Sequence, residues 1–184
     1  MAPSDHQPEL RTERLLLRPF RADDAADVER LAGEREIAVN TATIPHPYPE
    51  GAAAEWIAIQ ARRQREGEEV AFAVVERESG RLVGAMGLRL IHPHRRAELG
   101  YWIGKPYWGR GYATEAARAV LRYGFETLGL NRIHATHFTR NPASGRVMQK
   151  IGMTHEGRLR QHHIKWGVAE DVDFYGVLRG EYFG

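Results

Sequence analysis

Apolar and small residues recur at helical spacing between positions 113 and 128. They occupy positions 113, 116, 117, 120, 121, 124, 125 and 128, which form one face of a helix with a 3.6-residue period. An apolar run at 97–103 precedes this helix, and RIHATHFT, residues 132–139, follows it with the alternation of a strand. Because a strand, a helix and a strand in this order form a βαβ unit, we expect the two strands to lie parallel.

Seven segments have the composition of strands and predict one twisted mixed sheet. They are residues 14–20, 70–76, 81–91, 97–103, 132–139, 153–163 and 171–178. The second, third and fourth are joined by tight links, so we expect an antiparallel meander that becomes parallel at the βαβ unit. The fold class is a single mixed α/β domain over residues 10–184, with helices on both faces of the sheet. Residues 1–9 are polar and hold two prolines, so they read as a loose tail rather than a signal peptide.

Three other segments complete the expected structure. Asp23 or Asp24 can cap a first helix. Residues 50–66 form a second, with Trp56, Ile57 and Ala61 on its buried side. Between the two helices, three prolines at alternate positions make residues 38–49 irregular; this loop either walls a pocket or merely connects.

Composition narrows the classes of function. The 184 residues, 42% hydrophobic and 27% charged, are ordinary for one soluble domain. Because the chain has no cysteine, disulfides, zinc–thiolate sites and cysteine nucleophiles are excluded, and a cytoplasmic location is compatible. No apolar run approaches the roughly 20 residues of a membrane span. The formal charge of +2 comes from interspersed charges of both signs, so we expect neither a membrane nor a nucleic-acid partner.

The turn before the long helix has features of an anion site. In the run Trp108-Gly109-Arg110-Gly111-Tyr112-Ala113-Thr114, two glycines allow the backbone to turn tightly and approach a ligand. The first amides of the following helix have no partner inside it, and the helix dipole is positive there. This arrangement suits a pyrophosphate. Gly-x-Gly also occurs in plain turns, and neither G-x-G-x-x-G nor a P-loop is present.

Several motifs occur in a fixed order over nearly all of residues 10–184. They are LRTERLLLRPF, ELGYWIGKPYWGRGYATEA, NPASGRVMQKIGM followed by HEGRLR, and DVDFYGVLRGEYF. Together they resemble the GNAT superfamily of N-acetyltransferases, and within it the branch that includes ribosomal-protein N-terminal alanine acetyltransferases. The superfamily's phosphate loop, Gln/Arg-x-x-Gly-x-Gly/Ala, corresponds here to Trp108-x-x-Gly111-x-Ala113, with an aromatic residue in the first position.

The resemblance implies acetyl-CoA as the acetyl donor and an amine as the acceptor. The amides around 109–113 would hold the donor's pyrophosphate, and the backbone of the strand at 101–103 would pair with its pantetheine arm. In the family the two parallel strands part at this point and the arm lies between them. The candidate cofactor-binding residues are therefore Trp102, Ile103, Trp108, Gly109, Arg110, Gly111, Tyr112, Ala113, Thr114, Asn141 and Ser144.

Acetyl transfer needs a base for the attacking amine and gains from a proton donor for the leaving thiolate. The resemblance places Ser144, in the first turn of the helix after Asn141-Pro142, near the cofactor sulfur, where its hydroxyl could protonate the thiolate. Two residues compete as the base. Glu98 shares a strand face with Trp102 by alternation, and His163 stands where the branch can carry a catalytic carboxylate. Three of these candidates also have a purely structural interpretation. Asn141 can serve only as a helix cap, Ser144 can be a common serine of a helix start, and Glu98 can be an exposed carboxylate on a strand.

Nine histidines invite a metal hypothesis that their spacing does not support. His134 and His137 lie three apart on a predicted strand and so face opposite ways, and no carboxylate accompanies them at ligand spacing. We therefore expect no metal site.

The acceptor stays open at this level. A protein N-terminus, a small-molecule amine and an amino-acid-like antibiotic or toxin all remain candidates, and residues 38–49 and 158–165 are expected to shape its pocket. A noncatalytic acyl-CoA-binding module is the alternative function, and both a monomer and a homodimer are compatible.

Overall fold

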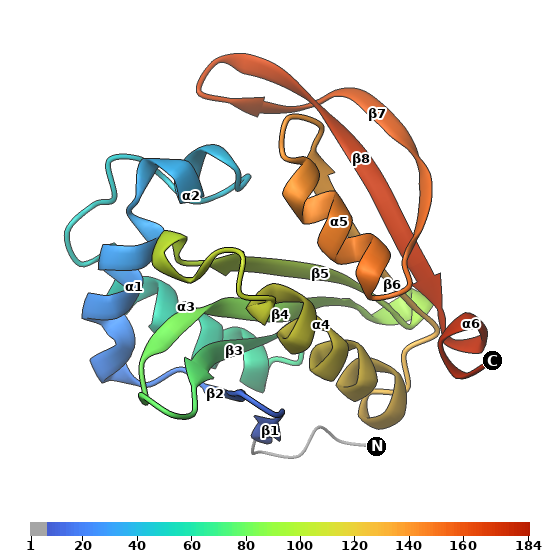
Figure 1. The fold of residues 1–184 in the computed structure, drawn as a ribbon, viewed down its shortest axis with the longest axis horizontal. Helices are drawn as coiled ribbons and strands as arrows, with labels where there is room; N and C mark the ends of the chain where they lie inside the picture. The colour runs from blue at the N-terminus through green and yellow to red at the C-terminus, as the bar shows by residue number, and fades with distance from the viewer. Residues whose placement is uncertain (1–6) are drawn as a thin grey trace.

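One mixed sheet carries the fold, with its strands in the order β1-β2-β3-β4-β5-β6-β8-β7 (Figure 1). The computed structural model describes residues 7–184. Seven strands correspond to the seven predicted segments, and the eighth, β1, has two residues, too few to show a period. The strands are β1 (Leu10–Arg11), β2 (Leu15–Pro19), β3 (Glu69–Glu76), β4 (Leu82–Ile91), β5 (Arg96–Ile103), β6 (Arg132–Phe138), β7 (Thr154–Lys165) and β8 (Val168–Leu178).

Helices cover both faces of the sheet, as predicted (Figure 1). On one face, α1, α2 and α3 bury apolar residues such as Val28, Ile37 and Ile57 against the sheet. On the other, α4 and α5 bury residues such as Val120 and Met148. The helices are α1 (Ala25–Ala32), α2 (Arg35–Val39), α3 (Ala52–Arg65), α4 (Tyr112–Arg122) with a π-helical last turn (Tyr123–Thr127), α5 (Pro142–Lys150) and α6 (Arg179–Phe183). Three short 3-10 turns add Ala22–Asp24, His92–His94 and Lys105–Tyr107.

The predicted change from antiparallel to parallel pairing occurs at β5. Strands β3, β4 and β5 form the antiparallel meander, and β5 then pairs with β6 in parallel. Strands β6, β8 and β7 return to antiparallel pairing. Figure 1 shows β7 and β8 as a long hairpin that extends beyond the rest of the sheet, on the side where α2 and α5 lie.

Two sequence-based expectations about helices need correction. No side-chain cap forms at α1: the Asp24 carboxylate instead accepts from the Arg21 amide at 2.7 Å and forms a buried ion pair with Arg18. In α3, Ala61 is exposed and Gln60 is buried, because the helix turns a slightly different face to the sheet than its apolar residues suggested.

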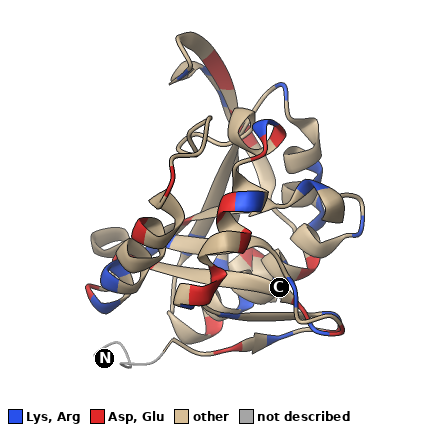
Figure 2. Cartoon of the chain, turned by 90° about the vertical axis from the view of Figure 1, so that its left-hand side faces the viewer, with Lys and Arg blue, Asp and Glu red and all other residues tan. Residues whose placement is uncertain are grey.

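The ends and the surface add little beyond what the sequence implied. The first six residues of the predicted tail lie outside the described part, whereas Gln7 donates a hydrogen bond to the Ala71 carbonyl at 2.9 Å. Among residues 7–184, none of the helices combines the length and the apolar composition that a membrane crossing needs. Figure 2 shows acidic and basic residues interspersed on the side that faces the viewer.

The Arg18–Asp24 ion pair makes the free energy of unfolding depend on pH in the acidic range. Burial alone would raise the pKa of Asp24, but hydrogen bonds from Arg18 and the Arg21 amide together lower it below its ordinary 3.8. Because the folded-state pKa is the lower one, the unfolded chain takes up the proton first, so this stability is present above pH 3.8 and lost as the pH falls through the folded pKa.

We therefore expect Asp24→Asn to lower the free energy of unfolding at neutral pH. We also expect this free energy to fall less steeply in the variant than in the wild type as the pH is lowered. Urea unfolding from neutral pH down to about pH 3 measures both effects. Asp27→Asn is a matched control, because Asp27 forms an exposed pair with Arg30. An acid limb that is equally steep in Asp24→Asn and the wild type contradicts this account.

Candidate active site

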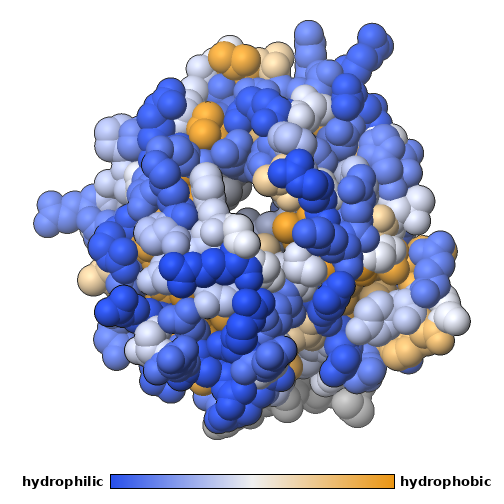
Figure 3. All heavy atoms as spheres, viewed as in Figure 1, coloured by the Kyte–Doolittle hydropathy of each residue, from blue (hydrophilic) through white to orange (hydrophobic). Residues whose placement is uncertain are grey.

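Strands β5 and β6 part soon after they meet. Within the described chain their parallel pairing covers three residue pairs, from Arg96↔Arg132 to Glu98↔His134. Beyond that point β5 continues to Ile103 and β6 to Phe138 without pairing to each other. The result is a cleft between the carboxyl ends of two parallel strands, where α/β proteins commonly bind ligands. Figure 3 shows the surface hollowed in the region that α2, α5 and the ends of β5 and β6 surround in Figure 1.

The backbone of β5 presents alternate residues to this cleft. The Gly104 amide donates to Val83 of the β4 segment at 2.9 Å, and the Arg95 carbonyl accepts from Asn131, just before β6, at 2.6 Å. By the alternation of an antiparallel ladder, Leu99, Tyr101 and Ile103 face the cleft with their N–H and C=O groups. Trp102 faces β4 instead, and its side chain is buried under α1 and α3. The β4–β5 register thus turns the Trp102 peptide away from the cleft, so the predicted role of Trp102 in cofactor binding has no support from its backbone and stays a prediction.

The Gly-rich turn lies between β5 and α4 and has an open set of amides. Gly109 and Gly111 have φ values of +75° and +82°, in the left-handed region that favours glycine. Within residues 7–184, no amide from Gly109 to Thr114 donates a hydrogen bond to a carbonyl or a side chain. These six N–H groups lie at and just before the start of α4, where the helix dipole is positive, and such an arrangement suits an anion. Trp108 closes the turn by donating from Nε1 to the Ile103 carbonyl at 2.6 Å.

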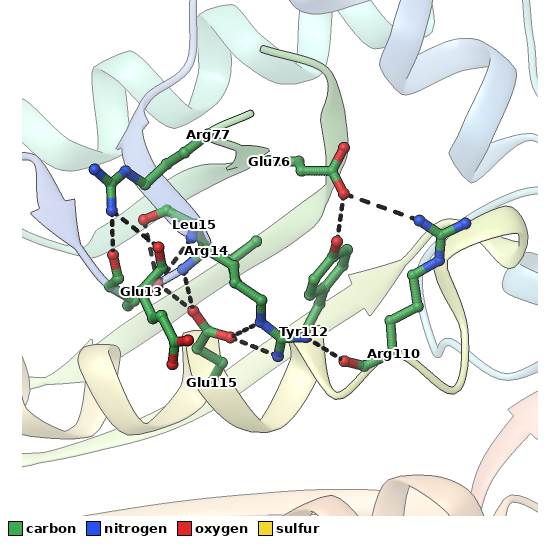
Figure 4. A network of polar contacts seen from close by, with 9 residues as sticks. Glu13, Arg14, Leu15, Glu76, Arg77, Arg110, Tyr112 and Glu115 are labelled. Carbon is green, nitrogen blue, oxygen red and sulfur yellow. Dashed lines mark hydrogen bonds and ion pairs between the residues drawn. The ribbon is translucent and has the colours of Figure 1, made fainter. Parts of the chain in front are cut away.

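A polar network ties this turn to the first strands (Figure 4). Glu115, in the first turn of α4, accepts from Thr12 Oγ1 at 2.6 Å, from the Arg14 amide at 2.8 Å and from Arg14 Nε at 2.7 Å. Arg14 also donates from Nη1 to the Arg110 carbonyl at 2.9 Å. These contacts fix the turn from behind and leave its amides free.

A second contact holds the other flank of the turn. Tyr112 is buried, and its hydroxyl donates to the carboxylate of Glu76 on β3. The Arg110 guanidinium lies 3.9 Å from the same carboxylate and over the Tyr107 ring. Arg110 therefore folds back along the turn, and Tyr112 can serve a ligand only through its amide.

The contacts of Glu115 stabilise its charged form. Burial alone would raise the pKa of Glu115, but hydrogen bonds from Thr12 and Arg14, with the charge of Arg14, lower it. Sequence reasoning missed this residue, because nothing local connects Glu115 to Thr12 and Arg14, which lie about a hundred positions away along the chain.

We expect Glu115→Gln to raise the KM for the anionic ligand of the turn about 10-fold, with kcat nearly unchanged, because a neutral amide keeps the shape of the side chain but weakens the hold of Arg14. Steady-state kinetics with varied donor concentration measures this split. Glu126→Gln serves as the control, since Glu126 is exposed at the far end of the same helical segment. A fall in kcat with unchanged KM would contradict a role in positioning the turn.

Ser144 meets an unpredicted partner across the cleft. Asn141 caps α5 as expected, accepting from the Ser144 amide at 3.4 Å, and Pro142 takes the first helical position. The Ser144 Oγ lies 2.7 Å from the hydroxyl of Tyr101 on β5. Burial raises the pKa of Tyr101 to about 12, although the hydrogen bond with Ser144 opposes that shift. Tyr101 therefore stays protonated near neutral pH and is a second hydroxyl at this point of the cleft.

The two candidate bases lie far apart. Glu98 forms an ion pair with Arg89 of β4, on the face of the sheet away from α4. Across the sheet, Glu98 lies next to His134 of β6, which in turn lies next to Gly176 of β8. His163 pairs with Glu170 of β8. Gly176 and Glu170 are six residues apart on β8, which corresponds to about 20 Å along the strand. One reaction centre cannot use both residues as its base.

A small cavity of about 50 Å³ lies at the end of β6, and His163 lines it. Its other walls come from the 38–49 loop, from β6 and from β8. The loop and the 158–165 segment therefore both contribute to the walls of this cavity, and their role in shaping the acceptor pocket stays a prediction. The remaining lining residues are Asn40, Ala42, Thr136, His137, Phe138 and Val172. Glu98 is not among them, so the cavity favours His163 of the two.

His134 and His137 face opposite sides of β6, as predicted. His134 stacks on Phe174, and His137 contacts Gly145 of α5 so closely that a Cβ there would lie 2.6 Å from its Nε2. No cluster of three or more histidine or carboxylate side chains that could hold a metal ion occurs within residues 7–184.

Comparisons with known proteins find similar sequences and similar folds. A family model described as an acetyltransferase (GNAT) domain matches residues 14–154. The uncharacterized N-acetyltransferase YoaA of Bacillus subtilis is 33% identical, over 94% of this chain and 97% of its own. The ribosomal-protein-S5-alanine acetyltransferase of Vibrio fischeri shares the fold with a TM-score of 0.83 at 19% identity, over 96% of this chain and 99% of its own. The spermidine N-acetyltransferase of Vibrio cholerae, solved with CoA and spermine, gives 0.81 at 24% identity, over 94% and 100%.

Proposed function

The chain belongs to the acetyltransferase (GNAT) domain family and is an acyltransferase with acetyl-CoA as its donor, and from this premise we propose how it works. It transfers the acetyl group by direct attack of a primary amine on the thioester, and the amine is either a protein N-terminus or part of a small molecule. The observation that carries the proposal is the set of six free amides from Gly109 to Thr114 at the mouth of the β5–β6 cleft.

The residues of the cleft fit the chemistry of this donor. A diphosphate needs several N–H donors, and the turn offers them with no competing partner among the described residues. A pantetheine arm carries amide groups, and the Leu99 carbonyl and both peptide groups of Tyr101 lie beyond the last β5–β6 pair, where β6 has moved away. The bound donor supplies the activated acetyl group, and the protein supplies orientation and proton transfer.

The proton steps use groups that line the cleft. The amine nitrogen forms a bond to the thioester carbon, the C–S bond breaks, and the thiolate leaves. The Ser144 hydroxyl donates to the thiolate, Tyr101 passes its own proton to Ser144 along their hydrogen bond, and solvent returns a proton to Tyr101, so that both hydroxyls are restored. His163 removes the extra proton of the amine and releases it to solvent, because an imidazole nitrogen can accept a proton and this one lines the cavity where an amine can enter.

Glu98 is the competing base. It lies on the face of β5 opposite to Tyr101, is engaged by Arg89 and lies outside the cavity. If Glu98→Gln abolishes activity while His163→Ala leaves it intact, the assignment of the base reverses.

The experiment that tests the function measures release of free thiol from acetyl-CoA with a panel of peptides and small amines. We expect turnover with at least one class of amine and an acetylated product of the corresponding mass. Tight coenzyme A binding with no turnover across the panel would favour a noncatalytic acyl-CoA-binding module instead.

A further inference from the structure

Lys165, at the end of β7, is a buried ammonium without a counter-ion. It is 6% exposed, and its Nζ donates to the Ile44 carbonyl at 2.8 Å and lies 5.0 Å from the centre of the Trp166 ring. No carboxylate of residues 7–184 forms an ion pair with it. Burial lowers the pKa of Lys165, and the charge of Arg140 lowers it further. A buried charge without an opposite charge is costly, so its retention calls for an explanation.

The nearby carboxylate is already engaged elsewhere. Glu170, across the β7–β8 hairpin, pairs with Arg140 at 2.9 Å. Arg140 uses two further N–H groups on Asn40 and the Val39 carbonyl. An ammonium has three N–H donors, and only one acceptor for Lys165 lies in the described chain. The carboxylate beside Lys165 is therefore committed to Arg140, and Lys165 is short of acceptors.

Lys165 lies beside the cavity at the end of β6. It follows His163 by two residues on β7, so by strand alternation both side chains lie on the same face. His163 lines the cavity together with Asn40 and Ala42, and Lys165 contacts Ile44 of the same loop. None of the residues that line this cavity is a carboxylate. A polyamine would bring several positive charges to a wall that has nothing to neutralise them.

We propose that Lys165 binds a carboxylate of the acceptor, so that the acceptor is a small amine with a negative charge beside its amino group, such as an α-amino acid. The proposal rests on the proposed acetyl transfer and narrows its acceptor. His163 then lies two residues from Lys165 on β7, close to the amine to be acetylated. Peptide N-termini and polyamines lack a carboxylate at this distance and are poorer substrates.

Matched acceptors test the proposal. A set of L-α-amino acids, the corresponding amino-acid amides, alanine-initiated peptides and spermidine are compared by kcat/KM. The wild type is expected to prefer amino acids. Lys165→Met should lower kcat/KM for amino acids about 30-fold, roughly the contribution of one charged hydrogen bond, and change the value for amides less than about 2-fold. Lys165→Arg should restore part of the loss, and Lys150→Met, at an exposed lysine, should change neither.

The outcomes distinguish a failure of the proposed role of Lys165 from a failure of the proposed acetyl transfer. Equal losses for amino acids and amides, or a wild type that prefers spermidine or peptides, overturn the role of Lys165 and leave acetyl transfer intact. No turnover with any amine, while coenzyme A still binds, overturns the proposed function and this proposal with it. Unchanged coenzyme A affinity in Lys165→Met shows that the variant is folded.

Discussion

Replacing Gly111 with alanine is expected to weaken coenzyme A binding about 100-fold, measured by calorimetry. Gly111 is the N-cap of α4 at φ +82°, where a Cβ costs about 1–2 kcal/mol. The turn can relieve that cost only by rotating its peptides, which moves the free amides of 109–114 away from the diphosphate. Each charge-assisted hydrogen bond lost is worth about 1.5–3 kcal/mol, and a tenfold change corresponds to about 1.4 kcal/mol.

Gly51 provides a matched control in the same protein. It is the N-cap of α3 at φ +78°; a Cβ there meets no atom within 4 Å, and one at Gly111 makes only an ordinary 3.5 Å contact with Arg14 Nη2. Gly51→Ala should therefore show a similar loss of stability, with coenzyme A affinity unchanged. If Gly111→Ala binds coenzyme A as tightly as Gly51→Ala does, the turn is not the diphosphate site.

Ser144→Ala is expected to lower kcat about 100-fold, the usual contribution of a positioned proton donor, while the KM for acetyl-CoA changes less than about 3-fold. Tyr101→Phe should lower kcat less, because Ser144 keeps its hydroxyl but loses the partner that holds and reprotonates it. Since the pKa of Tyr101 is raised to about 12, that loss should be the same from about pH 6 to pH 9.

Tyr175→Phe is the control for this pair. Tyr175 is also buried, and its hydroxyl accepts from Gln149 of α5 at 3.3 Å. It therefore reports the cost of removing a buried hydroxyl beside the same helix. Equal kcat values for Ser144→Ala and the wild type, under conditions where chemistry limits the rate, would remove Ser144 from the mechanism.

Local patterns predicted the elements of this fold well. The alternation at 132–139 and the apolar face from position 113 onward identified β6 and α4, because burial on one face imposes a period that a short window reveals. The N-cap at Asn141 was equally readable, since Asn-Pro determines its own local geometry. Apolar residues alone could not show that Gln60 is buried and Ala61 exposed.

The parts of the site that the sequence did not predict depend on contacts between distant residues. Tyr101 and Ser144 are 43 positions apart, Arg14 and Glu115 are 101 apart, and Lys165 and Ile44 are 121 apart. No periodicity connects such residues; their proximity follows from the order of the strands. The orientation of the Trp102 peptide depends on the register between β4 and β5 and is equally invisible in a single sequence.

The short ladder between β5 and β6 also affects how the two halves of the molecule hold together. Only three residue pairs of the described chain join β5 to β6 directly. Along this seam, the line where β5 and β6 meet, the rest of the hydrogen-bond ladder is missing. A donor lying along that seam would supply missing rungs and act as a temporary strand. Folding and donor binding would then be linked, so that the melting temperature of this protein rises with the concentration of its own substrate.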